Sequence, residues 1–358
     1  MELFIAIVGT VVAVMVVLLV LVWTTTYHPA GIQSEPVVSP SDAPLVTPGQ
    51  ELKIMTWNVQ YMAGKNYVFW YDLDDRSGPD KRPSTADVEE TLKAVVRIIK
   101  DEAPDIILFQ EIDDGARRTG YVDQLNALLN RLPKTYCCHA SAFYWKAAFV
   151  PHHRIMGAVG MKLSTVSKYK ISEARRHQLA ALPNDPITRQ FHLKRALLET
   201  RLPLRDGRSL VILNTHLESF GQGTPVMQQQ IDQVQMLLSR LDREGISWVL
   251  GGDFNLVPSE RAYHRLPPAE KKSYLPKTEI SAIYRLYSGV PSLDQANGPE
   301  YKNWFTHFPN KPDITAPDRT IDYIFNSNDT RLGVHYVRQQ DTSHISDHFP
   351  VIAKIQIP

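Results

Sequence analysis

Short apolar runs alternate with amphipathic helical segments between residues 51 and 358, and the runs end on polar side chains. Runs such as 52–58, 105–111 and 247–255 have the length of buried strands. Between them, Ser84 with Asp87 three residues later resembles a helix N-cap, and apolar residues recur at helical spacing until Pro104. This alternation predicts an α/β domain rather than an all-helical or all-β one.

The polar side chains at the predicted strand ends form a consistent chemical set. They are Asn58, Glu111, His216, Asp253, Asn255, Asp322, Asp347 and His348. Asp and Asn are also common turn residues, so any one of them alone fits a turn better than a ligand. Carboxylate and amide oxygens are suitable ligands for a hard cation, and a histidine can act as a general base. The occurrence of all of them at one edge of a domain therefore predicts a cation site with a general base beside it.

The segment Leu3–Trp23 holds no charged residue, so it is not expected to belong to the globular domain. As a helix it would be roughly 30 Å long, the thickness of a bilayer core. We expect residues 1–27 to form a single transmembrane anchor. A cleaved signal peptide is the alternative, which the missing basic region, the missing cleavage site and the length disfavour. Neither flank carries Lys or Arg before Lys53, so orientation is not specified.

Residues 28–50 are rich in proline, with Pro at positions 29, 36, 40, 44 and 48. Such a density disfavours helices and strand pairing and predicts an extended, semi-rigid tether. The catalytic domain is then expected to span 51–358. A proline- and serine-rich stalk commonly holds a domain off an outer membrane face, which favours an extracytoplasmic domain.

Charge and cysteine content exclude some classes of protein. The formal net charge is +1, which gives no overall electrostatic signature of a duplex-DNA binder. The only cysteines are Cys137 and Cys138. Adjacent residues rarely have the geometry that a disulfide bond requires. No disulfide framework or cysteine metal site is therefore expected.

The motifs TWNV, LFQE, NTHLES, GGDFNLVP, TIDYIF and ISDHFPV occur in this order. Together they resemble the motif series of the endonuclease/exonuclease/phosphatase superfamily, and the resemblance covers about Leu52 to Ile357. It implies the DNase I-like fold, a four-layer α/β sandwich of two mixed sheets packed face to face with helices outside. It also implies hydrolysis of phosphate esters with Mg²⁺ or Mn²⁺.

The resemblance assigns roles to individual residues. Glu111 matches the main metal carboxylate, with Asn58 beside it and Asp347 completing the metal shell. His348 matches the general base that activates water, and Asp322 matches the carboxylate that orients its imidazole.

Three further matches concern the phosphate. Asp253 would orient the attacking water or help to bind metal, and Asn255 would hydrogen-bond the scissile phosphate. His216 would stabilise the phosphorane-like charge or protonate the leaving oxygen. Arg195 matches a basic phosphate ligand more loosely, and a strand-edge arginine without that role is an equal alternative. The family's carboxylate that supports the second histidine is missing, because residues 153–164 contain no Asp or Glu.

The substrate stays open, because the superfamily includes nucleases, apurinic-site repair enzymes, sphingomyelinases, inositol-phosphate phosphatases and deadenylases. A membrane tether favours a phospholipid head group or extracytoplasmic nucleic acid. The aromatic-rich insertion 61–82 would be a substrate lid or a packed surface loop. A phosphodiesterase is the main hypothesis; a catalytically idle binding module and a phosphomonoesterase acting on inositol phosphates are the alternatives. The oligomeric state is not specified.

Overall fold

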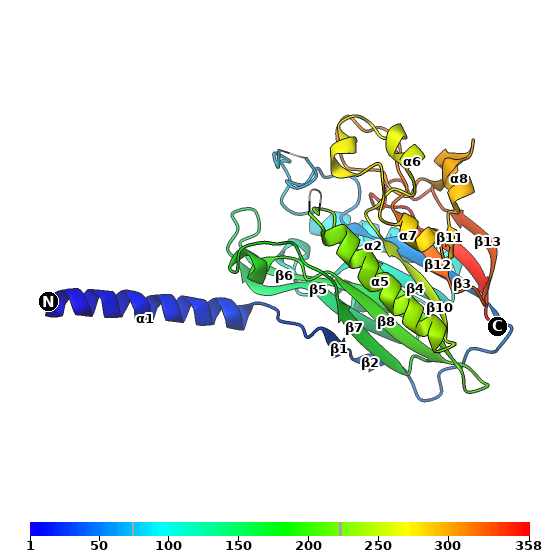
Figure 1. Ribbon diagram of the computed structural model, residues 1–358, viewed down its shortest axis with the longest axis horizontal. Helices are drawn as coiled ribbons and strands as arrows, with labels where there is room; N and C mark the ends of the chain where they lie inside the picture. Colours follow the sequence, from blue (N-terminus) through cyan, green and yellow to red (C-terminus); the bar gives the residue numbers. More distant parts are fainter. Residues whose placement is uncertain (74, 222–223) are drawn as a thin grey trace.

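Two mixed seven-stranded sheets pack face to face, with helices on their outer faces (Figure 1). The computed structural model describes residues 1–73, 75–221 and 224–358. The predicted four-layer α/β sandwich of the DNase I-like kind is therefore confirmed.

The first sheet has the order β1-β7-β8-β9-β10-β12-β11. Its strands are β1 (Ile32–Ser34), β7 (Glu173–Gln178), β8 (Ala196–Pro203), β9 (Ser209–His216), β10 (Ser247–Asp253), β11 (Ser288–Val290) and β12 (Asp322–Asn326). Only β9 and β10 run parallel among these pairs.

The second sheet has the order β13-β14-β3-β4-β6-β5-β2. Its strands are β2 (Val37–Val38), β3 (Glu51–Asn58), β4 (Ile106–Asp113), β5 (Cys138–Val150), β6 (Gly157–Ser167), β13 (Arg331–Val337) and β14 (Val351–Gln356). Here β3 and β4 form the parallel pair. In each sheet, then, two neighbouring strands end side by side at the same edge.

Successive side chains along each strand point to opposite faces of its sheet, so one set forms the core between the sheets and the other set faces the outer layers. Ile54 and Leu108 of the second sheet share one buried apolar cluster with Ile212 and Val249 of the first. A buried polar contact also joins the sheets, because Gln110 donates to Asn214 Oδ1 over 2.7 Å. Side chains of opposite parity along the same strands point outward toward helices.

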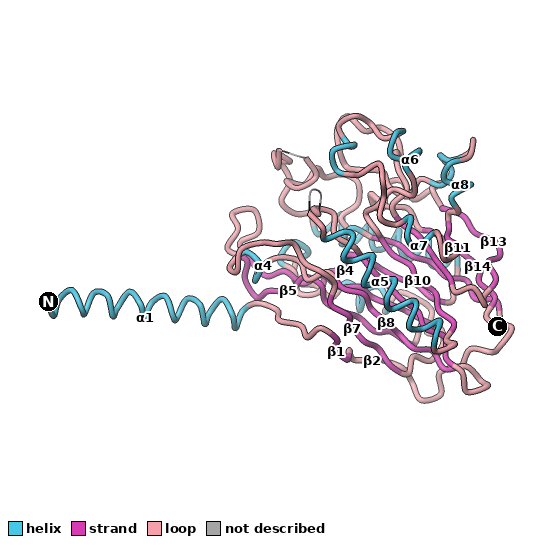
Figure 2. Tube along the Cα trace, viewed as in Figure 1, coloured by secondary structure: helices cyan, strands magenta, loops and turns pink. Residues whose placement is uncertain are grey.

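Two long amphipathic helices cover the outer faces. The helix α2 (Thr85–Glu102) packs Leu92 and Val95 on the second sheet, and α5 (Val226–Arg243) packs Ile231 and Val234 on the first. The predicted N-cap of α2 is confirmed, since Ser84 Oγ accepts the Asp87 N–H over 3.0 Å. The shorter helices are α3 (Gln124–Leu129), α4 (Thr188–Phe191), α6 (Glu260–Arg265), α7 (Ser281–Tyr284) and α8 (Leu293–Asn297). The path of the chain among helices, strands and loops is drawn in Figure 2.

The proline-rich segment 28–50 is not the free tether expected from its composition. β1 pairs with β7 and β2 pairs with β5, so the segment adds one short edge strand to each sheet. Val46 is fully buried in the core between the sheets. The prolines flank these strands instead of interrupting them, and edge positions leave one side of the backbone without a partner, which suits proline.

The helix α1 (Glu2–Thr25) projects away from the sandwich (Figure 1). It is long and apolar enough to cross a membrane, and none of its apolar window is buried. Length and composition are weak evidence on their own, because a signal sequence near an N-terminus has the same properties.

Candidate active site

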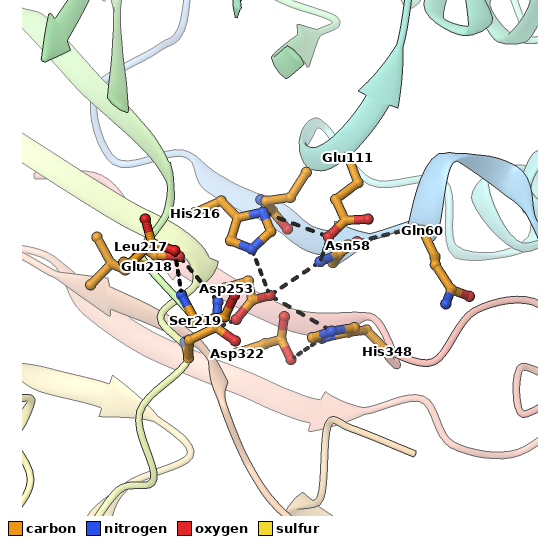
Figure 3. Close-up of polar contacts among 12 residues, drawn as sticks. Asn58, Gln60, Glu111, His216, Leu217, Glu218, Ser219, Asp253, Asp322 and His348 are labelled. Carbon is orange, nitrogen blue, oxygen red and sulfur yellow. Dashed lines mark hydrogen bonds and ion pairs between the residues drawn. The ribbon is translucent and has the colours of Figure 1, made fainter. Parts of the chain in front are cut away.

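The strand register of the first sheet brings three of the predicted residues into one row. His216 is the last residue of β9 and lies opposite Asp253, the last residue of the parallel strand β10. On the other side, Asp253 lies opposite Asp322, the first residue of the antiparallel strand β12. His216 and Asp322 are far apart in sequence and lie close together only because these strand ends meet at one edge (Figure 3).

The second sheet contributes the facing residues. Asn58 ends β3, and its neighbour β4 carries Glu111, so that Asn58 Nδ2 donates to Glu111 Oε1 over 3.2 Å. The same amide donates across the sandwich to Asp253 Oδ2 over 3.1 Å. The amide of Asn58 therefore hydrogen-bonds both to Glu111 of the second sheet and to Asp253 of the first.

The backbone of the GGDFN motif fits this position for steric reasons. Gly252 has φ +153°, and a Cβ there would lie 2.0 Å from the Thr215 carbonyl oxygen. After Asp253, Asn255 takes a left-handed conformation with φ 52° and its N–H donates to Asp253 Oδ1 over 2.9 Å. Asp253 and Asn255 thus form a turn, and the hydrogen bond within that turn also fixes the orientation of the Asp253 carboxylate in the site.

His348 lies between two carboxylates. Its Nδ1 is 2.8 Å from Asp322 Oδ2, and its Nε2 is 3.6 Å from Asp253 Oδ2. Burial alone would lower the pKa of His348, but Asp322 and Asp253 outweigh it and raise the pKa to about 10. The predicted pairing of His348 with Asp322 is present in the geometry.

His216 is supported by a residue that the sequence did not indicate. Tyr144 Oη lies 3.2 Å from His216 Nδ1, where a carboxylate had been expected from residues 153–164. Burial raises the pKa of Tyr144 well above its usual value, so the phenol keeps its proton and donates it to Nδ1. The proton of a neutral His216 then sits on Nε2, 3.3 Å from Asp253 Oδ2.

The charge state of His216 follows from its surroundings. Burial, and next Arg195 and His348, lower the pKa of His216 well below its usual value. A neutral ring with its proton on Nε2 can donate a hydrogen bond into the site. Tyr144 lies in the middle of β5 and belongs to no motif, so no sequence signal distinguished it from a core tyrosine.

Arg195 is buried with unused donors. Its Nη2 lies 3.7 Å from Glu218 Oε1 and 3.5 Å from Ser219 Oγ. Its Nε and Nη1 are buried and make no hydrogen bond with any part of the chain that the structure describes. Unpaired guanidinium donors in a buried site are costly unless an anion accepts from them.

The carboxylates at this edge repel one another. Burial and then Asp347 raise the pKa of Glu111, and burial and then Asp322 raise that of Asp253 to about 7. A fifth carboxyl comes from the insertion: burial and then Asp347 raise the pKa of Asp72 to about 8. A cation bound here would relieve this repulsion, so the oxygen donors of Asn58, Glu111 and Asp347 fit Mg²⁺ or Mn²⁺.

Within the part of the chain that the structure describes, two groups of side chains could hold a metal by distance alone. Asp253, Asp322 and His348 form one group, and His307, Asp347 and His348 form the other. The ring of His307, which the sequence did not indicate, lies 4.6 Å from that of His348. Glu111 belongs to neither group, so the assignment of Glu111 as the main metal carboxylate stays a prediction.

The insertion 61–82 is partly packed and partly open. Tyr61 and Phe69 are buried in their own apolar cluster, which agrees with the packed-loop interpretation. Trp70, Tyr71 and Asp72 are only partly buried; Trp70 and Tyr71 line a neighbouring cavity, and Asp72 lies close enough to Asp347 and Glu111 for their charges to raise its pKa. Residue 74 lies outside the described residues.

Comparison with known proteins gives the following matches. The family model described as the endonuclease/exonuclease/phosphatase family matches residues 55–348. A 5'-tyrosyl-DNA phosphodiesterase of Caenorhabditis elegans is 24% identical over 230 residues, which are 63% of this chain and 48% of that protein. The chain thus matches about half the length of this relative.

Solved structures share the fold at low identity. A Beutenbergia cavernae endonuclease/exonuclease/phosphatase is 20% identical with a TM-score of 0.54, over 86% of this chain and 72% of that one. The human nocturnin catalytic domain with bound sulfate is 18% identical with a TM-score of 0.52, over 90% of this chain and 97% of that one. At such identities these structures support the fold and not a substrate.

Proposed function

The chain belongs to the endonuclease/exonuclease/phosphatase family, and we propose that it is a membrane-anchored, Mg²⁺- or Mn²⁺-dependent phosphodiesterase. Membership supports phosphoester hydrolysis, and the 5'-tyrosyl-DNA phosphodiesterase relative supports a diester substrate. The observation that carries the proposal is the convergence of Asn58, Asp253 and His348 from both sheets on one buried point.

The proposed reaction is in-line hydrolysis by water. Asp253 orients the water. A bound cation would offset the charges of Asp253 and Asp347 that raise the pKa of His348, and the neutral His348 takes the proton at Nε2 while Nδ1 stays hydrogen-bonded to Asp322. The water oxygen bonds to phosphorus, one P–O ester bond breaks, and the leaving oxygen takes a proton from solvent. The products are a phosphate monoester and an alcohol.

Other side chains stabilise the charge that develops on the phosphate. His216 donates from Nε2, Asn255 donates from its amide, and Arg195 offers its two unused donors. A divalent cation at Asn58, Glu111 and Asp347 supplies positive charge that polarises the phosphate and lowers the pKa of acids beside it.

Hydrolysis of bis(4-nitrophenyl) phosphate by the purified full chain tests this function. We expect EDTA to abolish the activity, Mg²⁺ or Mn²⁺ to restore it, and His348→Ala to remain inactive after metal is added back. A chain that is inactive with every divalent cation would support the binding-module alternative. Activity limited to phosphomonoesters would support the phosphomonoesterase instead.

The membrane anchor is a separate part of the proposal, supported by the apolar, unburied α1. We expect the chain to stay in the membrane fraction at high salt and to be released by detergent. We place the domain outside the cytoplasm, so protease applied to intact cells should remove it. A domain that survives this treatment while α1 stays in the membrane would reverse the orientation.

A further inference from the structure

A cationic cavity of about 380 Å³ lies between the insertion 61–82, the loop at residues 117–118 and the β5–β6 hairpin. Its lining residues are Trp70, Tyr71, Lys81, Arg82, Arg117, Arg118, Trp145, His153, Arg154, Ile155, Ala158 and Val159. The lining includes five Lys and Arg side chains and no carboxylate. A volume of this size suits one head group or one nucleotide.

The cavity adjoins the catalytic residues through Arg118. Its guanidinium lies 3.4 Å from the ring of Tyr61 and holds Asp113 with two bonds of 2.8 and 2.9 Å. Trp145, another lining residue, directly follows Tyr144 in β5, and Tyr144 Oη lies 3.2 Å from His216 Nδ1 in the active site. A molecule in the cavity would therefore have its phosphate close to the active site.

Not all of these cations are already used by the fold. Arg117 donates to the carbonyl oxygens of Ile155 and Met156. In contrast, Lys81, Arg82 and Arg154 form no ion pair with any carboxylate in the described ranges. Free cations without a neighbouring carboxylate attract anionic groups.

The back wall of the cavity meets the end of α1. Thr26 forms a bridge with Ala147 of β5, and Ala147 lies opposite Val159 of β6, a lining residue. Trp145, two residues before Ala147, also lines the cavity. In Figure 1, α1 leaves the domain from the end at which β5 and β6 lie. A bilayer crossed by α1 would thus begin beside the cavity.

The surface at this end carries exposed apolar and basic side chains. Phe149 is 44%, Met156 48% and Ile187 58% exposed. Lys146 and Arg189 are exposed nearby in sequence. Apolar side chains mixed with cations are typical of surfaces that contact an anionic bilayer.

We propose that the cavity binds the head group of an anionic phospholipid, which enters from the bilayer as the substrate of the same active site. The inference rests on the proposed phosphodiesterase function and on the proposed anchor. Arg118 is neutralised by Asp113, but the other four lining cations would repel the quaternary ammonium of a choline lipid, so the cavity selects against it. The exposed apolar side chains of Phe149 and Met156 suit contact with a bilayer surface better than contact with a charged phosphate backbone.

The test uses the full chain in phosphatidylcholine vesicles with or without phosphatidylinositol, followed by ³¹P NMR of the released phosphate monoester. The variant Arg82→Gln with Arg154→Gln removes two free cations. The matched control, Lys134→Gln with Arg243→Gln, removes two exposed cations elsewhere. Soluble inositol phosphate and a single-stranded oligonucleotide are the comparison substrates, and bis(4-nitrophenyl) phosphate reports the basal activity.

We expect the wild type and the control to cleave phosphatidylinositol in preference to phosphatidylcholine. The cavity variant should lower the ratio of lipid to bis(4-nitrophenyl) phosphate hydrolysis by about 20-fold, since each cation at a membrane surface contributes about fivefold. Absence of basal activity in the wild type would refute the proposed function itself.

Basal activity with an unchanged ratio in the cavity variant would refute only the head-group inference. Equal cleavage of phosphatidylcholine would refute it as well. It would also be overturned by hydrolysis of soluble inositol phosphate but not vesicle lipid, or of the oligonucleotide but not lipid.

Discussion

Glu199 and Asp253 are buried carboxyl groups of the same sheet, and their pKa values move in opposite directions. Glu199, on β8, lies 2.8 Å from His177 Nε2, 3.0 Å from Arg201 Nη2 and 3.3 Å from Arg240 Nη2. Burial alone would raise the pKa of Glu199, but these partners lower it to about 2. Asp253 lies between His216 and Asp322, and burial with Asp322 raises its pKa to about 7 although His348 counteracts the rise.

This difference in pKa distinguishes Glu199, whose charge stabilises the fold, from Asp253, whose charge belongs to the candidate active site. The network around Glu199 is complete, so its ionised form stabilises the fold. Asp253 lies beside Asp322 in a buried row, and its pKa is raised even though His348 counteracts the rise, so the ionised form of Asp253 costs free energy in the fold. The predictions below test this distinction, beginning with the largest expected effect.

The largest effect should be on turnover at the catalytic edge. His348→Ala should lower kcat by about 10²–10⁴-fold, because the proposed base is lost. Asp322→Asn should cost less. In the double variant the losses should not multiply, because without the imidazole Asp322 has nothing to orient. Steady-state kinetics with Mg²⁺ checks this, and multiplicative losses would show that the two residues do not act as a unit.

Neutralising the two contrasted carboxyl groups should change stability in opposite directions. Glu199→Gln should lower the free energy of unfolding by about 3 kcal/mol, since it leaves buried cations without their partner. Asp253→Asn, measured with a chelator present, should raise it by about 1 kcal/mol, because repulsion is removed. Chemical unfolding of the full chain measures both. If both substitutions destabilise equally, the contrast between the two sites is wrong.

The contribution of Glu199 should also depend on pH. Because its folded pKa lies below the ordinary value of 4.5, its stabilisation is complete above about pH 4.5 and is lost as pH falls toward 2. The stability difference between wild type and Glu199→Gln should therefore shrink over this range. Unfolding curves at a series of pH values give the difference directly, and a constant difference down to pH 2 would contradict the assignment.

The smallest effect concerns the support of His216. Tyr144→Phe removes the hydrogen bond to Nδ1 of His216. It should lower kcat by about tenfold with KM little changed, because that factor corresponds to the free energy of about one hydrogen bond. Tyr136→Phe is the matched control, because Tyr136 Oη donates to the Pro104 carbonyl oxygen over 2.8 Å, outside the site. Equal kcat values for the two variants would show that Tyr144 only fills space.

Membership of the family and the layout of the sandwich could be predicted from local sequence. Periodicity predicted β3, α2 and β10 within about two residues at their ends, because the alternation of side chains along a strand or helix is a local property. The motif residues were identifiable for a similar reason, since Glu111 and Asp253 end predicted buried runs and His348 directly precedes the last one.

Other features were decided by contacts between distant segments. The strands β1 and β2 form in a proline-rich stretch because two sheet edges are available to pair with it. Tyr144 faces His216, and Asp72 approaches Asp347, because β5 and the insertion are brought to the same edge of the sandwich. Side chains of this kind carry no local signal, since what they do depends on partners that lie tens of residues away.

The sequence by itself determined the α/β class, the apolar segment α1 and the set of polar strand ends, because each of these features depends only on residues that are close together in the sequence. Only the tertiary structure decided which charges are balanced and which are not. Glu199 belongs to no motif and is a stabilising ion-pair partner, while Asp253 lies in the GGDFN motif and has a raised pKa. The pKa of a buried carboxyl depends on charges within a few ångströms, and strand pairing, not sequence distance, sets those neighbours.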